Sequence, residues 1–288
     1  MIAGAAVRDV ATPSGGRVRT WTLGPADGTA TPVLLLHGWP QTSAVWHLVA
    51  PLLARTRTVV AADLPGYGDS MLPPGAGVAA SGKRAMADDL VAAMSELGHR
   101  RFSVVGHDRG ARVGYRLALD HPDRVAALAV LDVLPTLDVA ERVDAAFARA
   151  AWHWFLLARP PDLPERLLAA EPDATLGRGL DVCAPEALAA YRAAWSRPEV
   201  RHGMCQDYRA GWDVDVEIDR ADRGVRTIGC PTLVMWGEHG ALRRYADVMV
   251  AWRRWAPAAH GVVLPCGHHL PEERPDDVAA AVLGMLGG

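Results

Sequence analysis

The chain of 288 residues carries 30 Lys and Arg against 33 Asp and Glu, a formal net charge of −3, and half of its residues are hydrophobic. The near balance of charge argues against a general nucleic-acid or anionic-membrane binder, because both need a basic excess. Length and hydrophobic content predict a compact globule with a large core rather than a disordered chain.

Short apolar runs alternate with helical patterns along the chain. The predicted strands span residues 33–36, 58–62, 102–105, 125–131, 232–236 and 261–264, and the predicted helices span 43–54, 83–97, 111–119, 243–255 and 275–286. Fully apolar strands are typical of a parallel sheet that is buried on both faces. The alternation therefore predicts an α/β fold, a mostly parallel sheet flanked by helices.

The alternation stops between about Pro135 and Gly224, where the pattern is helical and broken by prolines. We interpret residues 135–224 as a helical cap domain inserted into a core domain of residues 1–134 and 225–288. In open α/β sheets, ligands bind outside the carboxyl ends of the strands, so we expect the cap to cover that edge.

Four isolated cysteines and a single lysine narrow the chemistry further. Cys183, Cys205, Cys230 and Cys266 are far apart and form no C-x-x-C pair, so we expect free thiols and no zinc knot or disulfide framework. Lys83 is the only lysine, and we set lysine-based covalent chemistry aside. No window reaches the roughly 18 apolar residues that span a bilayer. A cytoplasmic enzyme is the default expectation.

The run Gly106-His107-Asp108-Arg109-Gly110 follows a predicted strand and precedes a predicted helix. It has the frame of the nucleophile elbow G-x-S-x-G with aspartate in the serine's place. Asp108 would be a carboxylate nucleophile that forms an ester with a substrate carbon. The alternative is an aspartate that merely caps the helix. An earlier turn, His37-Gly38-Trp39-Pro40, predicts an oxyanion hole formed by the N–H groups of Trp39 and Arg109.

The base is expected after the last strand, where the chain reads Cys266-Gly267-His268-His269. We select His268, with His269 as the rival, to activate water against the ester. The orienting acid is less direct, because Gly240 stands where many enzymes of this fold place an aspartate. Asp132, at the end of the preceding strand, is the natural replacement, and Glu238 is the second choice.

These motifs resemble those of the haloacetate dehalogenases of the α/β-hydrolase superfamily, which hydrolyse substrates such as fluoroacetate. The matching runs cover almost the whole chain: residues 37–41, 63–68, 106–112, 131–135, 153–154, 207–211, 267–268 and 270–273. The pair Arg109 and Arg112 best distinguishes the haloacetate dehalogenases from the related epoxide hydrolases, which usually carry tryptophan after the nucleophile. Two departures concern the pocket: Trp39 replaces a common phenylalanine, and His269 replaces what is often an aromatic residue.

The resemblance implies a role for each matching residue. Arg109 and Arg112 would bind the substrate carboxylate, since guanidinium forks bind carboxylates and stay charged. His153, Trp154 and Tyr208 would bind the departing halide. The resemblance further implies a homodimer that takes a small haloacid and needs no metal or organic cofactor. We expect no nucleic-acid or membrane partner.

Three alternatives remain open at this stage. An epoxide hydrolase would use the same Asp-His pair with two cap tyrosines as acids, and Tyr191 and Tyr208 are the candidates. A dehalogenase could prefer chloroacetate or bromoacetate to fluoroacetate. A non-catalytic hydrolase-fold protein could bind a small ligand, although the set Asp108, Asp132 and His268 argues against it.

Overall fold

The computed structural model of the protein describes residues 2–25, 30–177, 179–240, 242 and 247–287. An eight-stranded sheet forms its centre, in the order β1-β2-β4-β3-β5-β6-β7-β8. The strands are β1 Ala6–Ala11, β2 Arg17–Leu23, β3 Val33–Leu36, β4 Val59–Ala62, β5 Phe102–His107, β6 Val125–Leu131, β7 Thr232–Gly237 and β8 His260–Leu264. From β4 to β8 all neighbouring strands are parallel, which confirms the predicted fold class.

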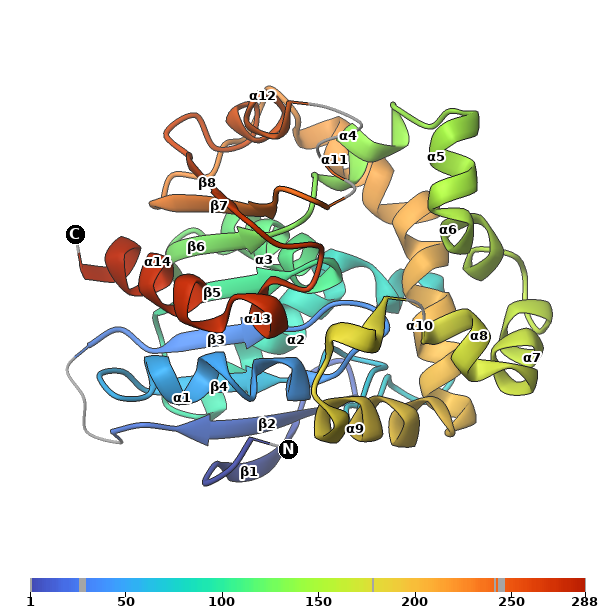
Figure 1. The fold of residues 1–288 in the computed structure, drawn as a ribbon, viewed down its shortest axis with the longest axis horizontal. Coiled ribbons are helices and arrows are strands. Elements are labelled where there is room, and N and C mark those ends of the chain that lie inside the picture. The colour runs from blue at the N-terminus through green and yellow to red at the C-terminus, as the bar shows by residue number, and fades with distance from the viewer. Residues whose placement is uncertain (1, 26–29, 178, 241, 243–246, 288) are drawn as a thin grey trace.

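The apolar runs became the central strands because helices cover both of their faces. Every residue of β3, β4 and β5 is buried. Helices α1 (Val49–Leu53) and α14 (Pro275–Gly287) pack together on one face, and α2 (Lys83–Glu96) and α3 (Arg109–Asp120) pack together on the other (Figure 1). The remaining helices of this part are η1 Ser43–Trp46, η2 Val78–Ser81, α12 Val248–Arg253 and α13 Leu270–Glu273.

Two antiparallel strands and one helix break differ from the sequence prediction. Strands β1 and β2 were not predicted, because β1 is an exposed edge strand with Arg8 and Asp9 and has no apolar run. The helix predicted over residues 43–54 is two short helices, η1 and α1. The helix predicted over 243–255 begins among residues that the structure does not describe, and its described part is α12.

Between β6 and β7 the described chain forms helices joined by short turns. They are α4 Thr136–Ala140, α5 Ala145–Ala150, α6 Trp152–Leu157, α7 Leu163–Ala170, α8 Pro172–Leu176, η3 Leu180–Val182, α9 Pro185–Trp195, α10 Pro198–Ala210, the π-helical turn η4 Gly211–Asp215 and α11 Val216–Asp222. Proline opens α8, α9 and α10, where it has no N–H to leave unpaired. We call this segment the helical insertion. It lies beyond the carboxyl ends of the parallel strands (Figure 1).

The lengths of these helices bear on membrane association. Among the described residues, no helix has the length and apolar character that crossing a membrane requires.

Candidate active site

Asp108 stands at the sharp turn between β5 and α3. Its backbone has φ 48°, which is rare for a residue with a Cβ atom. The glycines on either side allow the turn: a Cβ at Gly106 would lie 2.5 Å from the carbonyl oxygen of Gly110, and one at Gly110 would lie 2.3 Å from that of Leu36. The strand, turn and helix thus stand where the elbow motif predicts them.

The Asp108 carboxylate is fixed through one of its two oxygens. The backbone N–H of Trp39 donates to Oδ1 at 2.9 Å, and Oδ2 lies outside this bond. Burial by itself would raise the pKa of Asp108. The charges of His268 and Arg109 and the Trp39 hydrogen bond outweigh burial and lower the pKa, so this carboxylate is ionised at neutral pH.

His268 and Asp132 form a directly bonded pair. Nδ1 of His268 lies 2.6 Å from Oδ2 of Asp132, and the N–H of Gly237 donates to Oδ1 of Asp132 at 3.1 Å. Burial by itself would lower the pKa of His268, but the hydrogen bond and charge of Asp132 outweigh it and raise the pKa to about 9. Among the predicted histidines, His268 is therefore the one that a carboxylate orients.

The second choice for the acid, Glu238, is exposed, whereas Asp132 is buried against the imidazole. Gly240 explains how Asp132 could take over the usual role. A Cβ at Gly240 would lie 3.2 Å from Oδ1 of Asp132, so both positions face the same point. Asp132, which follows β6, thus lies where a side chain at Gly240, which follows β7, would reach.

Two further histidines surround His268. Nε2 of His107 lies 2.8 Å from the carbonyl oxygen of His268, and Nδ1 of His269 lies 3.4 Å from Nε2 of Gln41. One nitrogen from each of the three rings lies within 4.8 Å of the others, the one such cluster in the described part of the chain. Among these three rings, that of His268 is bonded through Nδ1 to the carboxylate of Asp132.

The two predicted anion-binding arginines are almost completely buried, with 1% and 2% exposure. Arg109 directs Nε and Nη2 onto the carboxylate of Asp207, at 2.8 and 2.7 Å, which leaves Nη1 outside this pairing. Arg112 donates from Nη1 to the hydroxyl of Thr136 at 3.1 Å. Among the described residues, no carboxylate forms an ion pair with Arg112. The role of Asp207 was not predicted, because its partners come from distant parts of the sequence.

A cavity of about 440 Å³ opens at the nucleophile. Its walls include Asp108, His268, Trp39, His153 and Tyr208. The rings of Trp39 and His153 stack in parallel with centroids 4.6 Å apart, and Tyr208 meets both rings edge-on. The structure therefore brings the predicted nucleophile, base and two of the three predicted halide ligands into one space.

Trp154 and the arginines lie behind this wall. Trp154, Arg109 and Arg112 are not among the described residues that line the cavity. Arg109 and Trp154 contact the lining residue Tyr208, and Arg112 contacts Trp154. The guanidinium of Arg109 lies 4.2 Å from the ring centroid of Tyr208, and that of Arg112 lies 4.6 Å from the ring centroid of Trp154. Trp154 in turn meets Tyr208 edge-on. Cation–π contacts of this kind fix both guanidinium planes next to the cavity.

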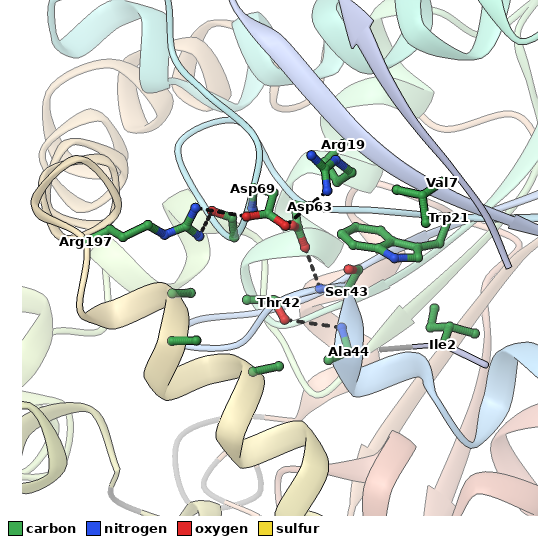
Figure 2. Close-up of a pocket in the computed structure, with 14 residues that line it drawn as sticks. Ile2, Val7, Arg19, Trp21, Thr42, Ser43, Ala44, Asp63, Asp69 and Arg197 are labelled. Atoms are coloured by element: carbon green, nitrogen blue, oxygen red, sulfur yellow. Dashed lines mark hydrogen bonds and ion pairs between the residues drawn. The ribbon is translucent and has the colours of Figure 1, made fainter. Parts of the chain in front are cut away.

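A second cavity, of about 420 Å³, lies between β2, η1 and α9 (Figure 2). Its charged groups pair with one another: Asp69 accepts from Arg197 at 2.9 Å and from Arg19 at 3.2 Å. Asp63 accepts from the backbone N–H groups of Ser43 and Asp69. Both carboxylates are thus paired with neighbouring residues of the protein. The cavity at Asp108 is therefore the candidate active site.

Tyr191, one of the two tyrosines that an epoxide hydrolase would use, lies elsewhere. Its hydroxyl donates to Glu272 at 3.4 Å, and it is not among the described residues that line the cavity at Asp108. Tyr208 does line this cavity. Burial raises the pKa of Tyr208 well above its usual value, so its hydroxyl stays protonated and can donate.

The fold and this elbow define a class. The family model of the alpha/beta hydrolase fold matches residues 31–275, and the chain belongs to this family. The resemblance to haloacetate dehalogenases is confirmed: the chain is 45% identical over 268 residues to a fluoroacetate dehalogenase of Burkholderia sp, covering 90% of this chain and 88% of the relative.

Two further comparisons bracket this match. A soluble epoxide hydrolase of Corynebacterium sp. (strain C12) is 33% identical over 89% of this chain and 90% of its own. A solved structure of an alpha/beta hydrolase from Nostoc sp PCC 7120 superposes with a TM-score of 0.94 at 45% identity, covering 99% of each chain. The relatives are thus named for two reactions, dehalogenation and epoxide hydrolysis. The geometry of the site is needed to distinguish between them.

Proposed function

We propose that the protein is a haloacetate dehalogenase that converts fluoroacetate and water to glycolate and fluoride. The observation that carries the proposal is a buried arginine, Arg112, with no carboxylate partner among the described residues, one helical turn beyond an ionised aspartate nucleophile. A buried cation of this kind calls for an anion. The match to the Burkholderia enzyme supports the same reaction.

In the first step, the arginines hold the substrate carboxylate and direct its Cα toward Oδ2 of Asp108. The Oδ2 electron pair forms a C–O bond as the carbon–halogen bond breaks, with inversion, and the halide leaves with that bond's electrons. Fluoride leaves reluctantly, so hydrogen-bond donors must meet the developing charge. His153, Trp154 and Tyr208 are the proposed donors.

In the second step, His268 takes a proton from water, and the resulting hydroxide attacks the ester carbonyl carbon of Asp108. Negative charge develops on the carbonyl oxygen, where the N–H of Trp39 already donates to Oδ1. The N–H of Arg109 is the proposed second donor. As this intermediate collapses, the bond to the glycolate oxygen breaks and that oxygen takes the proton held by His268. The Asp108 carboxyl group then loses the remaining water proton to solvent and is again a carboxylate. Asp132 keeps the imidazole oriented and stabilises its charged form.

An epoxide hydrolase is the second candidate, and the Corynebacterium relative supports it. That reaction needs an acid to protonate the epoxide oxygen. The hydroxyl of Tyr191 is directed to Glu272, so Tyr208 is the tyrosine left for this task. A Tyr191→Phe variant should therefore leave halide release from haloacetates unchanged.

The test offers the purified protein fluoroacetate, chloroacetate and an epoxide, and measures released halide and diol. We expect halide from both haloacetates. Absence of halide from both would overturn the proposal, and diol alone would establish the second candidate. The relative rates also decide which halide is preferred. Neither product from any substrate would favour a non-catalytic binding protein.

Two variants test the roles of the proposed residues. Asp108→Asn should abolish turnover, because the neutral amide is a poor nucleophile. His268→Asn should form the ester and fail to hydrolyse it, so intact-protein mass spectrometry should detect the carboxymethyl group added to Asp108. A His268→Asn protein that turns over without accumulating an adduct would remove His268 from the second step.

We further propose that residues 135–224 act as the cap over this site and that the protein works as a cytoplasmic homodimer. The support is the placement of the helical insertion beyond the strand ends and the family membership. Light scattering of the purified protein at several concentrations tests the dimer.

A further inference from the structure

The only lysine of the chain is buried in an unfavourable place. Lys83 is the first residue of α2 and is 1% exposed. A cation at a helix amino terminus opposes the helix dipole, and burial adds the cost of removing the charge from water. The neighbouring groups compensate: the ammonium group is bonded to Asp207 and lies 3.5 Å from Oδ2 of Asp215.

Asp207 joins this lysine to the proposed substrate arginine. Its carboxylate accepts hydrogen bonds from Nε and Nη2 of Arg109, from the hydroxyl of Tyr67 at 2.6 Å and from Lys83. Its backbone carbonyl accepts a further bond from Nη2 of Arg109 at 2.8 Å. Burial by itself would raise the pKa of Asp207, but Arg109 and Lys83 hold it well below its usual value. The carboxylate is therefore ionised.

This arrangement creates a problem that Lys83 solves. Three hydrogen bonds that Arg109 donates to Asp207 fix the guanidinium, but the negative charge of Asp207 would cancel the positive charge that a substrate anion needs. A second cation on Asp207 restores the balance. The set Lys83, Asp207 and Arg109 carries one net positive charge, with Nη1 of Arg109 outside the pairing.

We propose that Asp207 and Lys83 are positioning residues for Arg109: Asp207 orients its guanidinium, and Lys83 offsets the charge of Asp207 so that Arg109 still attracts the substrate carboxylate. The inference rests on the proposed function for its substrate, but it concerns anion binding and can be measured without turnover. It extends the site to the first residue of α2 and to α10.

The other charges near this set do not change the direction of the expected effect. Asp215 accepts a hydrogen bond from the backbone N–H of Lys83 at 2.8 Å, and the charge of Arg112 also acts on Arg109. Removing the ammonium group leaves two aspartates beside Arg109. The net charge near the substrate carboxylate falls by one unit, whether or not Asp215 is ionised. The electrostatic potential at that carboxylate therefore becomes more negative.

The experiment measures acetate binding by calorimetry, since acetate is the substrate with hydrogen in place of the halogen. Lys83→Met should weaken acetate binding about tenfold, the effect of one charge at close range in a partly screened interior. Lys83→Arg keeps the charge and should stay within about threefold of the wild type. Acetamide, a neutral analogue, controls for a general distortion of the pocket. Equal losses for acetate and acetamide would overturn the proposal.

The double variant Lys83→Met with Asp207→Asn removes both charges and keeps the net charge, so it also serves if the single variant does not fold. Acetate binding should return to within about threefold of the wild type. Halide release from chloroacetate should stay about tenfold lower, because Arg109 has lost its clamp. A folded double variant that cannot bind acetate would contradict the charge role, and one with full activity would contradict the orienting role.

This test separates the two proposals. Wild-type protein that binds acetate but releases no halide would end the proposed function and leave the Lys83 inference standing. If the wild-type protein releases halide and Lys83→Met binds acetate as tightly as the wild type, the Lys83 inference is wrong and the proposed function stands.

Discussion

The charge state of His268 ties the two chemical steps together. With a pKa of about 9, the imidazole is protonated in the resting protein at neutral pH, and a protonated ring cannot act as a base. The negative charge of Asp108 is one of the interactions that raise this pKa. In the proposed mechanism, ester formation would remove that charge, so the pKa of His268 should fall before the second step. The first step needs only an ionised Asp108 and is compatible with a protonated ring.

The two half-reactions should therefore respond differently to pH. Ester formation should stay nearly constant from about pH 6 to about pH 9, because the pKa of Asp108 lies below its usual value. Ester hydrolysis should accelerate over the same interval as His268 loses its proton. Rapid-quench kinetics with mass detection of the adduct measures both rates. Parallel pH profiles for the two steps would contradict this assignment of the base.

At the level of elements, the turn between β5 and α3 depends on contacts that no side chain can enter. Gly110→Ala would place a Cβ 2.3 Å from the carbonyl oxygen of Leu36 and displace β3 or α3. We expect at least a tenfold loss of halide release and a lower melting temperature, measured by calorimetry. Gly284→Ala is the matched control. It lies in α14 with no atom within 4 Å of the added Cβ, and should stabilise the protein by about 0.5–1 kcal/mol.

The same elements show what the sequence can predict. Strands β3 and β6 match the predicted bounds, because continuous apolar runs have no alternative to burial on both faces. The elbow and the histidine after β8 were predictable because each follows a strand end directly. Strands β1 and β2 were not, since one exposed face leaves only an alternating pattern with charges in it.

The contacts that Asp207 makes with Arg109, Lys83 and Tyr67 could not be predicted from the sequence, for a different reason. Lys83, Tyr67 and Asp207 belong to three distant segments, and only the folded chain brings them together. From the sequence, Lys83 was only the single lysine of the chain, and lysine-based covalent chemistry was set aside. The structure places it on the carboxylate that holds the proposed substrate arginine, so its rarity in the sequence carried no information about its position.

At the level of the whole molecule, buried polar contacts join the helical insertion to the sheet and its helices. Trp195 of α9 donates to the carbonyl oxygen of Pro40, and Asp207 of α10 binds Lys83 and Tyr67. On the other side, Tyr115 of α3 donates to Asp219 of α11 at 2.6 Å. Because these contacts involve buried polar groups, each has a cost if its partner is lost. The insertion and the sheet should therefore unfold together.

Asp219 gives this junction a pH dependence with a definite sign. Burial raises its pKa to about 6, against 3.8 in an exposed setting, despite hydrogen bonds from Tyr115 and Leu137. Between these values the folded protein binds more protons at Asp219 than the unfolded chain does. The contribution of Asp219 to stability is therefore largest at low pH and falls as the pH rises through about 6.

Asp219→Asn removes this titration and keeps an oxygen that can accept from Tyr115. The free energy of unfolding of the wild type, relative to the variant, should fall by about 1 kcal/mol between pH 5 and pH 7. Urea denaturation at both values measures it. The same change at Asp173, an exposed residue of α8, controls for replacing an aspartate by asparagine. A difference between wild type and Asp219→Asn that does not vary with pH would mean that this carboxylate is not protonated in the folded protein near pH 5.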